Sequence, residues 1–397
     1  MIFTGYNLIN EKYLTEFLQA NDFWGLVEEE YDCIWTLEDI GGGDGNYLND
    51  LDRESLYALS LNDAVFIPSE YLNNKNRCFK KNGRSREGLR VSSHANSIVT
   101  SKFEFFSDSF TCHRLVNGFF DFLGGRKWAP LEEIPFECVE ENVVFLGLLC
   151  NHFGHALVDL PARLWFFRRF LPELLKLKFK FAFFPTHGLT SETDKLPEWL
   201  NSLCVFFDIP LDKVLIIDRP VSFKRAIIPK RVSPYLGGGG DFKLFKDAFN
   251  GGEFPRKSSA KIFLSRSGLR SDARSLNEQD QKRLEEFFVR QGFCIIHSQD
   301  FDLKTQIHLI RNASHIAGLA GSQLHLALFC SGQKIKMFKI APEGFNLPID
   351  RMIMRLVGGE YSQFVVKGQG DGHRSEWNIP EQYFSDLESK VLQWLQL

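Results

Sequence analysis

The chain has 397 residues, of which 44% are hydrophobic and 24% charged, and its formal net charge at pH 7 is −3. This composition is typical of a globular protein, and the length allows two domains because single cores usually stop growing near ~250–300 residues. The slightly acidic balance argues against a general nucleic-acid binder, so no nucleic-acid partner is expected.

The eight cysteines include no Cys-x-x-Cys pair, which favours free thiols in a reducing compartment. The first residues lack a secretory signal, and no uncharged apolar stretch reaches the ~18 residues of a membrane span. We therefore expect a cytoplasmic protein. Basic and aromatic residues alternate between Trp165 and Phe184, which would suit peripheral contact with the inner face of a membrane. A solvated helix followed by a buried strand explains that segment equally well.

Residues 1–130 show weak periodicity and receive no functional assignment. Helix-like pieces lie near Glu11–Leu26 and Arg53–Leu61, and polar loops lie near 72–97. We treat this stretch as an additional N-terminal region of uncertain role.

From 131 to 235, short apolar runs alternate with longer amphipathic ones, which predicts a first Rossmann-like domain. The expected strands are Val143–Leu149, Phe179–Phe184, Val214–Ile217 and Ala226–Ile228, and the expected helices are 152–171 and 195–207.

Residues 236–260 are rich in glycine and include four consecutive glycines, which predicts a hinge. A second alternating series over 261–380 predicts another Rossmann-like domain, followed by a C-terminal helix over 381–397 that packs back across the hinge. The expected strands are Ile262–Leu264, Phe293–His297, His315–Ala317 and Ile335–Ile340, and the expected helices are Asn277–Arg290, Leu303–Arg311, Ser322–Phe329 and Leu347–Leu356. The predicted class is α/β, with two doubly wound domains facing a cleft.

One stripe of titratable residues stands out after the first of these strands. His152, His155, Asp159 and Arg163 are spaced by three, four and four residues, which aligns them on one face of a helix that Asn151 could cap. The stripe predicts one wall of an active site. An ordinary surface stripe beside a core stripe is the alternative.

The second domain contains a candidate anion site. Ser265 and Arg266 directly follow a strand, with Arg274 close behind, and arginine can fork onto phosphate oxygens. A solvated basic loop is the alternative.

A glycine-containing turn adds to this candidate anion site. Gly318, Gly321 and Ser322 lie between a strand and a helix, which points backbone N–H groups at an anion, and His325 lies within one turn of the helix start. His325 could reach a nucleotide or sugar, although a lone histidine in an apolar helix is more often a core residue.

Two Asp-x-Asp triplets are candidate metal sites. Asp302 of the Asp300–Asp302 triplet is better explained as a helix N-cap, and the Asp50–Asp52 triplet resembles an EF-hand loop only superficially. We expect neither a bound metal nor another cofactor.

Three segments together resemble glycosyltransferase family 61, whose members include capsular polysaccharide enzymes, xylan-decorating transferases and protein O-linked N-acetylglucosaminyltransferases. They are Asn151–Leu164, then Phe263–Arg266 with Arg274 and Asn277-Glu278, and finally Ile316–Phe329 with the strand that follows. The resemblance covers roughly residues 140–366. The chain departs from the family's His-Gly-Ala-Gly-Leu at Ala320–Leu324, where Ala320 stands in place of the histidine.

The resemblance implies a GT-B fold and an inverting, metal-independent transferase, with a nucleotide-sugar donor in the C-terminal domain and a polysaccharide or lipid-linked glycan as acceptor. His155 would be the base and Asp159 its orienting partner, with Asp159 itself as the second choice. Asn151, His152 and Arg163 would lie on the acceptor side. The donor side would be formed by Ser265, Arg266, Arg274, Gly318, Gly321, Ser322 and His325. A carbohydrate- or nucleotide-binding protein that has lost catalysis is the competing hypothesis, motivated by Ala320.

Overall fold

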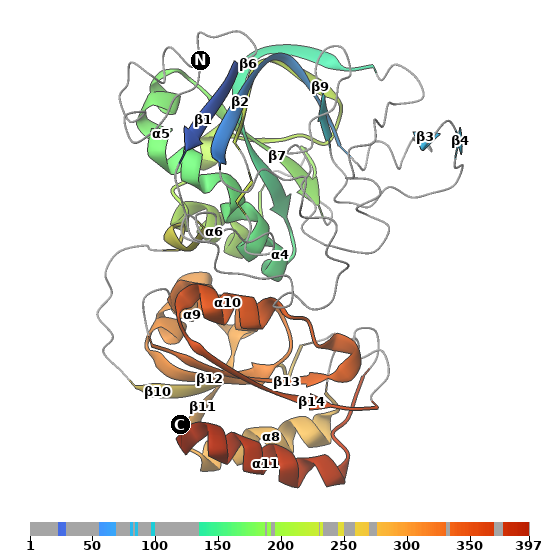
Figure 1. Cartoon of the computed structure of the whole chain (residues 1–397), viewed down its shortest axis with the longest axis vertical. Coiled ribbons are helices and arrows are strands. Elements are labelled where there is room, and N and C mark those ends of the chain that lie inside the picture. Colours follow the sequence, from blue (N-terminus) through green and yellow to red (C-terminus); the bar gives the residue numbers. More distant parts are fainter. Residues whose placement is uncertain are drawn as a thin grey trace. The chain divides into compact units, whose positions relative to one another are not determined.

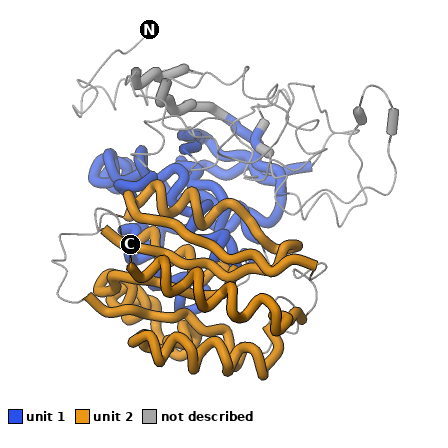
Figure 2. The backbone as a smooth tube through the Cα atoms, turned by 60° about the horizontal axis from the view of Figure 1, so that its bottom comes forward, with its two compact units in different colours: residues 1–248 blue, residues 249–397 orange. Residues whose placement is uncertain are grey.

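The structure is a computed structural model that describes residues 23–28, 55–68, 80–81, 84–85, 97–99, 135–186, 189–191, 195–229, 231–232, 245–249, 259–269, 276–330, 334–368 and 376–396. The chain divides into two compact units, residues 1–248 and 249–397, which Figure 2 colours separately. The division falls inside the segment expected to be a hinge. Among the described helices, no helix is long and apolar enough to cross a membrane.

Unit 1 is built on a mixed seven-stranded sheet. Its order is β1-β2-β9-β6-β7-β8, with β5 (Ser97–Val99) paired to β2. Strands β6 (Glu137–Cys150), β7 (Lys180–Thr186), β8 (Val214–Ile216) and β9 (Val221–Pro229) run parallel. Strand β2 (Ser55–Ile67) pairs antiparallel with β9, and β1 (Phe23–Glu28) pairs antiparallel with β2 at the end of the sheet. A separate hairpin pairs β3 (Lys80–Lys81) with β4 (Arg84–Ser85).

The prediction for the N-terminal region is wrong where the structure describes it. Residues 53–61 were expected to be helical, but 55–61 belong to β2, and the end of the other expected helix overlaps β1. The reason is long-range pairing, because β2 forms a ladder with β9 that local periodicity does not reveal. Phe66 of β2 also packs against Phe145 and Phe223 in the core of unit 1.

The helices of unit 1 follow the parallel strands (Figure 1). Helix α4 (Phe153–Asp159) runs into a 3₁₀ turn, η4 (Leu160–Arg163), and then into α5 (Leu164–Lys176). Helix α6 (Glu198–Phe206) and the turn η5 (Leu211–Lys213) precede β8. The N-cap of α4 is His152 rather than the expected Asn151, and no side chain caps this end.

The order of the parallel strands locates a ligand-binding edge in unit 1. The chain passes from β6 to β7 and β8 on one side, whereas β9 lies on the other side of β6. Such a reversal of strand order opens a crevice at the carboxyl ends of the flanking strands, where ligands bind in open α/β sheets. Cys150 ends β6 and Arg231 comes two residues after the end of β9, so the residues around α4 lie at this reversal.

Unit 2 contains a five-stranded, wholly parallel sheet of order β11-β10-β12-β13-β14. The strands are β10 (Ala260–Ser265), β11 (Phe293–His297), β12 (Ala313–Leu319), β13 (Lys336–Pro342) and β14 (Glu360–Val366). In chain order this is 2-1-3-4-5, a doubly wound arrangement whose reversal lies between β10 and β12.

Helices cover both faces of the second sheet (Figure 1). Helices α8 (Glu278–Arg290) and α11 (Glu381–Gln396) cover one face, and α9 (Leu303–Arg311) and α10 (Ile349–Val357) the other. The expected helix after β12 is instead a 3₁₀ helix, η7 (Ser322–Cys330), and shorter turns η6 (Ser298–Asp300) and η8 (Glu343–Phe345) follow β11 and β13.

The C-terminal helix belongs to the core of unit 2. Phe384, Leu387, Val391 and Trp394 of α11 are buried against the sheet, where the Trp394 ring contacts Phe338. The expectation that this helix packs back across the hinge is therefore wrong, because its apolar stripe completes the second core.

Candidate active site

The candidate base lies on α4 in unit 1. Nδ1 of His155 is 3.6 Å from Oδ2 of Asp159, one helical turn further along, and the ring of His155 contacts that of His152 at 4.7 Å between centroids. The His155 side chain keeps 16% of its surface exposed, whereas that of Asp159 keeps 2%. Nδ1 of His155 is thus turned toward a carboxylate, and the ring keeps a partly exposed surface.

Asp159 has a second charged partner that the sequence did not suggest. Nη2 of Arg231 donates to Oδ1 of Asp159 at 3.0 Å, and both side chains are buried. The carboxylate thus holds an arginine with one oxygen and faces a histidine with the other. An acid already paired in this way is a poor candidate for the base itself, which supports His155 as the first choice.

A buried thiol lies beside this group. Burial raises the pKa of Cys150 to about 11, a hydrogen bond with Thr186 opposes the shift, and the nearby charge of Asp159 adds to it. Cys150 therefore lines the site as an uncharged thiol at physiological pH.

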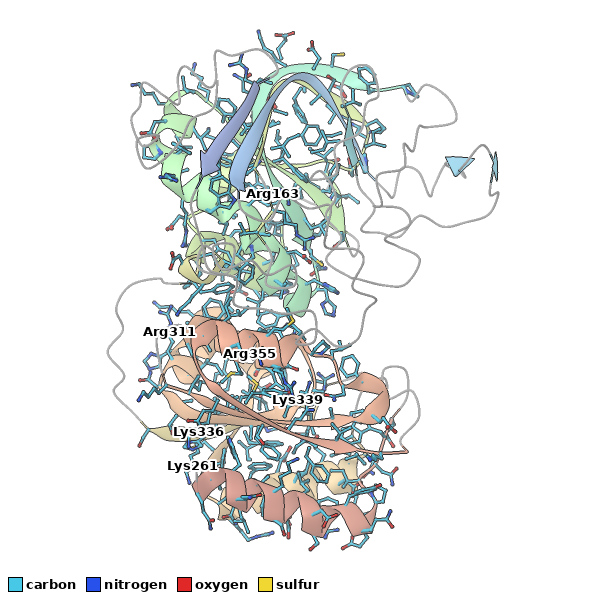
Figure 3. The ribbon with its side chains drawn as sticks, viewed as in Figure 1. Arg163, Lys261, Arg311, Lys336, Lys339 and Arg355 are labelled. Carbon is cyan, nitrogen blue, oxygen red and sulfur yellow. The ribbon has the colours of Figure 1, made fainter. Side chains whose placement is uncertain are left out.

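Arg163 lies apart from the exposed side of the predicted stripe. It is 1% exposed, its Nε donates to the carbonyl oxygen of Pro229 at 3.0 Å, and its guanidinium lies 4.8 Å from the Phe145 ring centroid (Figure 3). The cause is η4, because a 3₁₀ turn has three residues per turn and rotates Arg163 off the face set by α4. Its placement does not support direct acceptor contact. Asn151 is exposed and His152 half-buried, so both remain available on that side.

In unit 2, Arg266 and Gly321 meet across the strand reversal. Arg266 follows β10 and Gly321 lies between β12 and η7, and a Cβ built on Gly321 would overlap Nη1 of Arg266. The guanidinium therefore rests on the glycine backbone at the carboxyl edge of the sheet, close to the start of η7 at Ser322. A cation beside helix-start N–H groups is an arrangement that binds anions.

Ser265, expected to contact the donor, is fully buried and points toward α8. Its hydroxyl donates to Oε1 of Glu285 at 2.5 Å and accepts from the backbone N–H of Ser267 at 3.0 Å. Ser267 in turn lies 3.3 Å from Nδ1 of His297 at the end of β11. Ser265 thus shapes the turn that carries Arg266, while Ser267 and His297 reach the edge.

Gly318 and Ala320 serve packing. A Cβ on Gly318 would lie 3.0 Å from the carbonyl oxygen of Leu264, so the glycine allows close approach of two strands and η7. Ala320 is buried with Ala341 and Phe345. Gly321 and Ser322, which follow Ala320, are half-buried at the carboxyl edge of the sheet.

His325 belongs to a buried charged cluster. Its Nε2 lies 3.7 Å from Oδ1 of Asp350, whose Oδ2 lies 3.1 Å from Nζ of Lys339. Lys339, labelled in Figure 3, is fully buried and also donates to the carbonyl oxygen of Leu347 at 2.7 Å. Both Nε2 and the buried Nδ1 of His325 are turned to the protein interior, which favours a structural role over donor contact.

Asp302 caps a helix, as predicted. It is the N-cap of α9, where its side chain accepts from the N–H of Thr305 at 2.7 Å. Within the described ranges, no group of three or more His, Cys, Asp or Glu side chains is placed to hold a metal ion. Arg274 and the Asp50–Asp52 triplet lie outside the described residues.

Comparison with known families assigns this region. Residues 153–335 match the family model described as Glycosyltransferase 61. This region belongs to glycosyltransferase family 61. The family predicted from the sequence is confirmed for these residues, and the matched domain supports a glycosyltransferase. A comparison with curated proteins found no match to the chain. The matched region contains the His155 pair of unit 1 and the Arg266 edge of unit 2.

Sequence reasoning missed three residues of these sites: Arg231, His297 and Asp350. Arg231 is 72 positions from the carboxylate it binds, so spacing could not reveal the pair. His297 could have been found from the sequence, because it ends a predicted strand that pairs with β10, the strand before Arg266.

Proposed function

We propose that the chain is an inverting glycosyltransferase of GT-B architecture that moves a sugar from a nucleotide-sugar donor to a glycan acceptor without requiring a metal ion. The observation that carries the proposal is the Arg266 guanidinium resting on Gly321 at the strand reversal of a parallel sheet. In this sheet type the reversal is the usual nucleotide position.

The donor diphosphate would bind at this edge of unit 2. Arg266 would fork onto phosphate oxygens, and the N–H groups of Gly321 and Ser322 would donate to them. As the glycosidic bond to the diphosphate breaks, these fixed donors would stabilise the growing negative charge on the leaving group. Ser267 and His297 would add further hydrogen bonds, and Arg274 remains a predicted donor residue.

The acceptor would be activated by His155 of unit 1. Nε2 would take the proton of the attacking hydroxyl while Nδ1 faces Asp159, which stabilises the imidazolium that forms. The hydroxyl oxygen would then form a bond to the anomeric carbon as the bond to the diphosphate breaks. A single displacement of this kind needs one base and inverts the anomeric configuration.

A glycan acceptor is the general expectation for a glycosyltransferase, and a polysaccharide or lipid-linked glycan is the finer proposal. Support for a lipid-linked acceptor comes from the end of α5, where Leu175 and Leu177 are exposed beside Lys176 and Lys178. Apolar and basic side chains together suit peripheral contact with an anionic membrane, here on the cytoplasmic side.

A panel of nucleotide sugars, with candidate glycan acceptors and with or without EDTA, tests the proposal. We expect one donor to raise the thermal unfolding temperature and to release nucleotide in EDTA. The product should show the inverted anomeric configuration by proton NMR. A retained configuration, or release abolished by EDTA, would contradict the mechanism. Donor binding without release in the presence of every acceptor would favour a protein that has lost catalysis.

A further inference from the structure

A chain of hydrogen bonds runs behind the Arg266 edge of unit 2 and ends at a carboxylate. Its members are His297 at the end of β11, Ser267, Ser265 at the end of β10, and Glu285 of α8. We infer that Glu285, acting through the two serines, orients the His297 imidazole to accept a hydrogen bond from a ribose hydroxyl of the donor. Glu285 is thus a positioning residue and His297 a specificity-determining one. The inference rests on the proposed function, because it needs a nucleotide at this edge.

The direction of the chain is set at its inner end. A carboxylate can only accept hydrogen bonds, so the hydroxyl of Ser265 donates to Oε1 of Glu285 at 2.5 Å. That uses the single proton of the hydroxyl, and Oγ of Ser265 can only accept from its other neighbours. The two nearest are the hydroxyl oxygen and the backbone nitrogen of Ser267, at 2.9 and 3.0 Å, which fill its two lone pairs. Nε2 of Gln281 is further away, at 3.2 Å, and also donates to Glu285 at 2.9 Å.

The same reasoning determines which ring nitrogen of His297 carries the proton. Because the hydroxyl proton of Ser267 points to Ser265, the Ser267 oxygen accepts from Nδ1 of His297 at 3.3 Å. Every donor then points toward the carboxylate, so the bonds reinforce one another. In the neutral imidazole this leaves Nε2 with a lone pair and no proton. None of the described residues is hydrogen-bonded to Nε2, and the side chain is half-buried. Nε2 can therefore accept from a ligand hydroxyl but not from a phosphate oxygen, which has no proton to donate.

The position of His297 favours the ribose as the source of that hydroxyl. Ser265 and His297 are paired in the parallel ladder of β10 and β11, so His297 lies one strand spacing, about 4.8 Å, from the strand that leads to Arg266. In doubly wound sheets that bind dinucleotides, the diphosphate lies at the turn after the first strand, and an acidic side chain further along the chain accepts from the ribose 2′-hydroxyl. His297, at the end of the second strand of unit 2, offers an acceptor in place of that acid.

The turn that carries Ser267 is held by the fold itself. The backbone N–H of Leu269 donates to the carbonyl oxygen of Arg266 at 3.2 Å, and Gly268 has a φ of +80°, in the left-handed region that favours glycine. Nε2 of Gln299, which follows β11, donates to the carbonyl oxygen of Ser267 at 3.0 Å. Ser267 is thus tied to the segments after both strands, so its hydroxyl lies beside His297 without a bound ligand.

The orientation of His297 can be tested without a ligand. In the full chain labelled with ¹⁵N-histidine, long-range ¹H–¹⁵N correlations at about pH 8 show which ring nitrogen is protonated, and His297→Gln identifies the signals. We expect the Nδ1–H form in the wild type. Glu285→Met removes the acceptor at similar side-chain length, so the Ser265 proton should turn to Ser267 and the Nε2–H form should dominate. Glu285→Gln keeps an acceptor oxygen and should keep the wild-type form, as should Glu286→Met at the exposed neighbouring position.

The ribose contact is tested by calorimetry with the diphosphates of adenosine, cytidine, guanosine and uridine and with their 2′-deoxy and 3′-deoxy counterparts. For the nucleotide that binds the wild type, loss of one ribose hydroxyl should weaken binding about three- to tenfold, the usual effect of one hydrogen bond. His297→Ala and Glu285→Met should lose this preference, whereas Glu286→Met should retain it.

The Nε2–H form in the wild type, or the Nδ1–H form in a folded Glu285→Met variant, would overturn the inference. Equal binding of ribose and both deoxyribose nucleotides would overturn it as well, while leaving the proposed function intact. Should Glu285→Met fail to fold, Ser267→Ala replaces it, because breaking the chain should abolish the preference and a retained preference would contradict the relay. If no nucleoside diphosphate binds, the proposed function fails together with the ribose contact, and the NMR result still decides the orientation of His297.

Discussion

The guanidinium of Arg266 lies against the backbone of Gly321, in the space that any other residue at 321 would fill with its Cβ. The two residues follow β10 and β12, the neighbouring strands between which the strand order of the second sheet reverses. The glycine thereby determines where the charge of the arginine is held.

Gly321→Ala should weaken donor binding. The added methyl group would displace the guanidinium from the edge, and loss of one charge-assisted contact predicts roughly a tenfold rise in the dissociation constant for a nucleoside diphosphate. Isothermal titration calorimetry measures this change. In an Arg266→Ala background the same substitution should have little further effect, because its action passes through the arginine. Additive losses would show that Gly321 matters for another reason.

His155→Gln should reduce turnover without reducing donor affinity. Removing a general base typically costs about 10²–10⁴-fold in rate, whereas the proposed donor contacts lie on unit 2. Single-turnover release of nucleotide in the presence of acceptor gives the rate, and calorimetry gives the affinity. The exposed His308 of α9 provides a matched control, and His308→Gln should retain full turnover. Wild-type turnover in His155→Gln would remove His155 from the mechanism.

Lys339→Met should strongly destabilise unit 2. The lysine is fully buried and paired with Asp350, and removing one partner of a buried pair leaves an uncompensated charge that costs about 3–5 kcal/mol. Urea denaturation measures the loss of unfolding free energy. Lys339→Met combined with Asp350→Ala should lose less than the sum of the two single variants. A single variant as stable as the wild type would contradict a stabilising ion pair between Lys339 and Asp350.

The described cysteines should differ in how fast they react with an alkylating reagent. Burial raises the pKa of Cys150 to about 11 and that of Cys204 to about 12, and Cys138 and Cys294 are exposed. Native alkylation with iodoacetamide near pH 7.5, followed by mass spectrometry, should modify Cys138 and Cys294 before Cys150 and Cys204. Rapid alkylation of Cys150 in the folded protein would contradict the structure.

The same shifts predict how stability depends on pH. A thiol whose pKa is raised on folding contributes stability that is present below its unfolded value of 9.0. That stability is lost as pH rises from about 9 toward the folded value of about 11. The midpoint of urea unfolding should therefore fall over this range, and Cys150→Ala should flatten the decline.

Local patterns predicted most of the parallel strands of the two sheets. Strands β6, β7 and β11 follow short apolar runs, and α8 and α9 follow amphipathic periodicity with side-chain caps at Asn277 and Asp302. The first unit's antiparallel strands could not be predicted in this way, because β2 owes its conformation to pairing with β9, more than 150 residues away.

The candidate site could likewise be predicted only where its contacts are local in sequence. His155 and Asp159 are four residues apart, so helical geometry predicted that their side chains lie close together. Arg231 and Asp350 were missed because tertiary folding brings them to their partners. Ser265 and Arg163 were expected to meet substrate and instead are buried, since burial of a side chain after a strand or within a 3₁₀ turn depends on the neighbouring elements.

Calorimetric titration of a nucleoside diphosphate and its sugar conjugates into the wild type and into Arg266→Ala tests the central claim most directly. Arg283→Ala is the control, because it removes an equal charge from the exposed surface of α8, where Arg283 pairs with Glu381. We predict binding to the wild type and to Arg283→Ala, and at least tenfold weaker binding to a folded Arg266→Ala. Equal affinity in all three proteins would place the donor elsewhere and contradict the account.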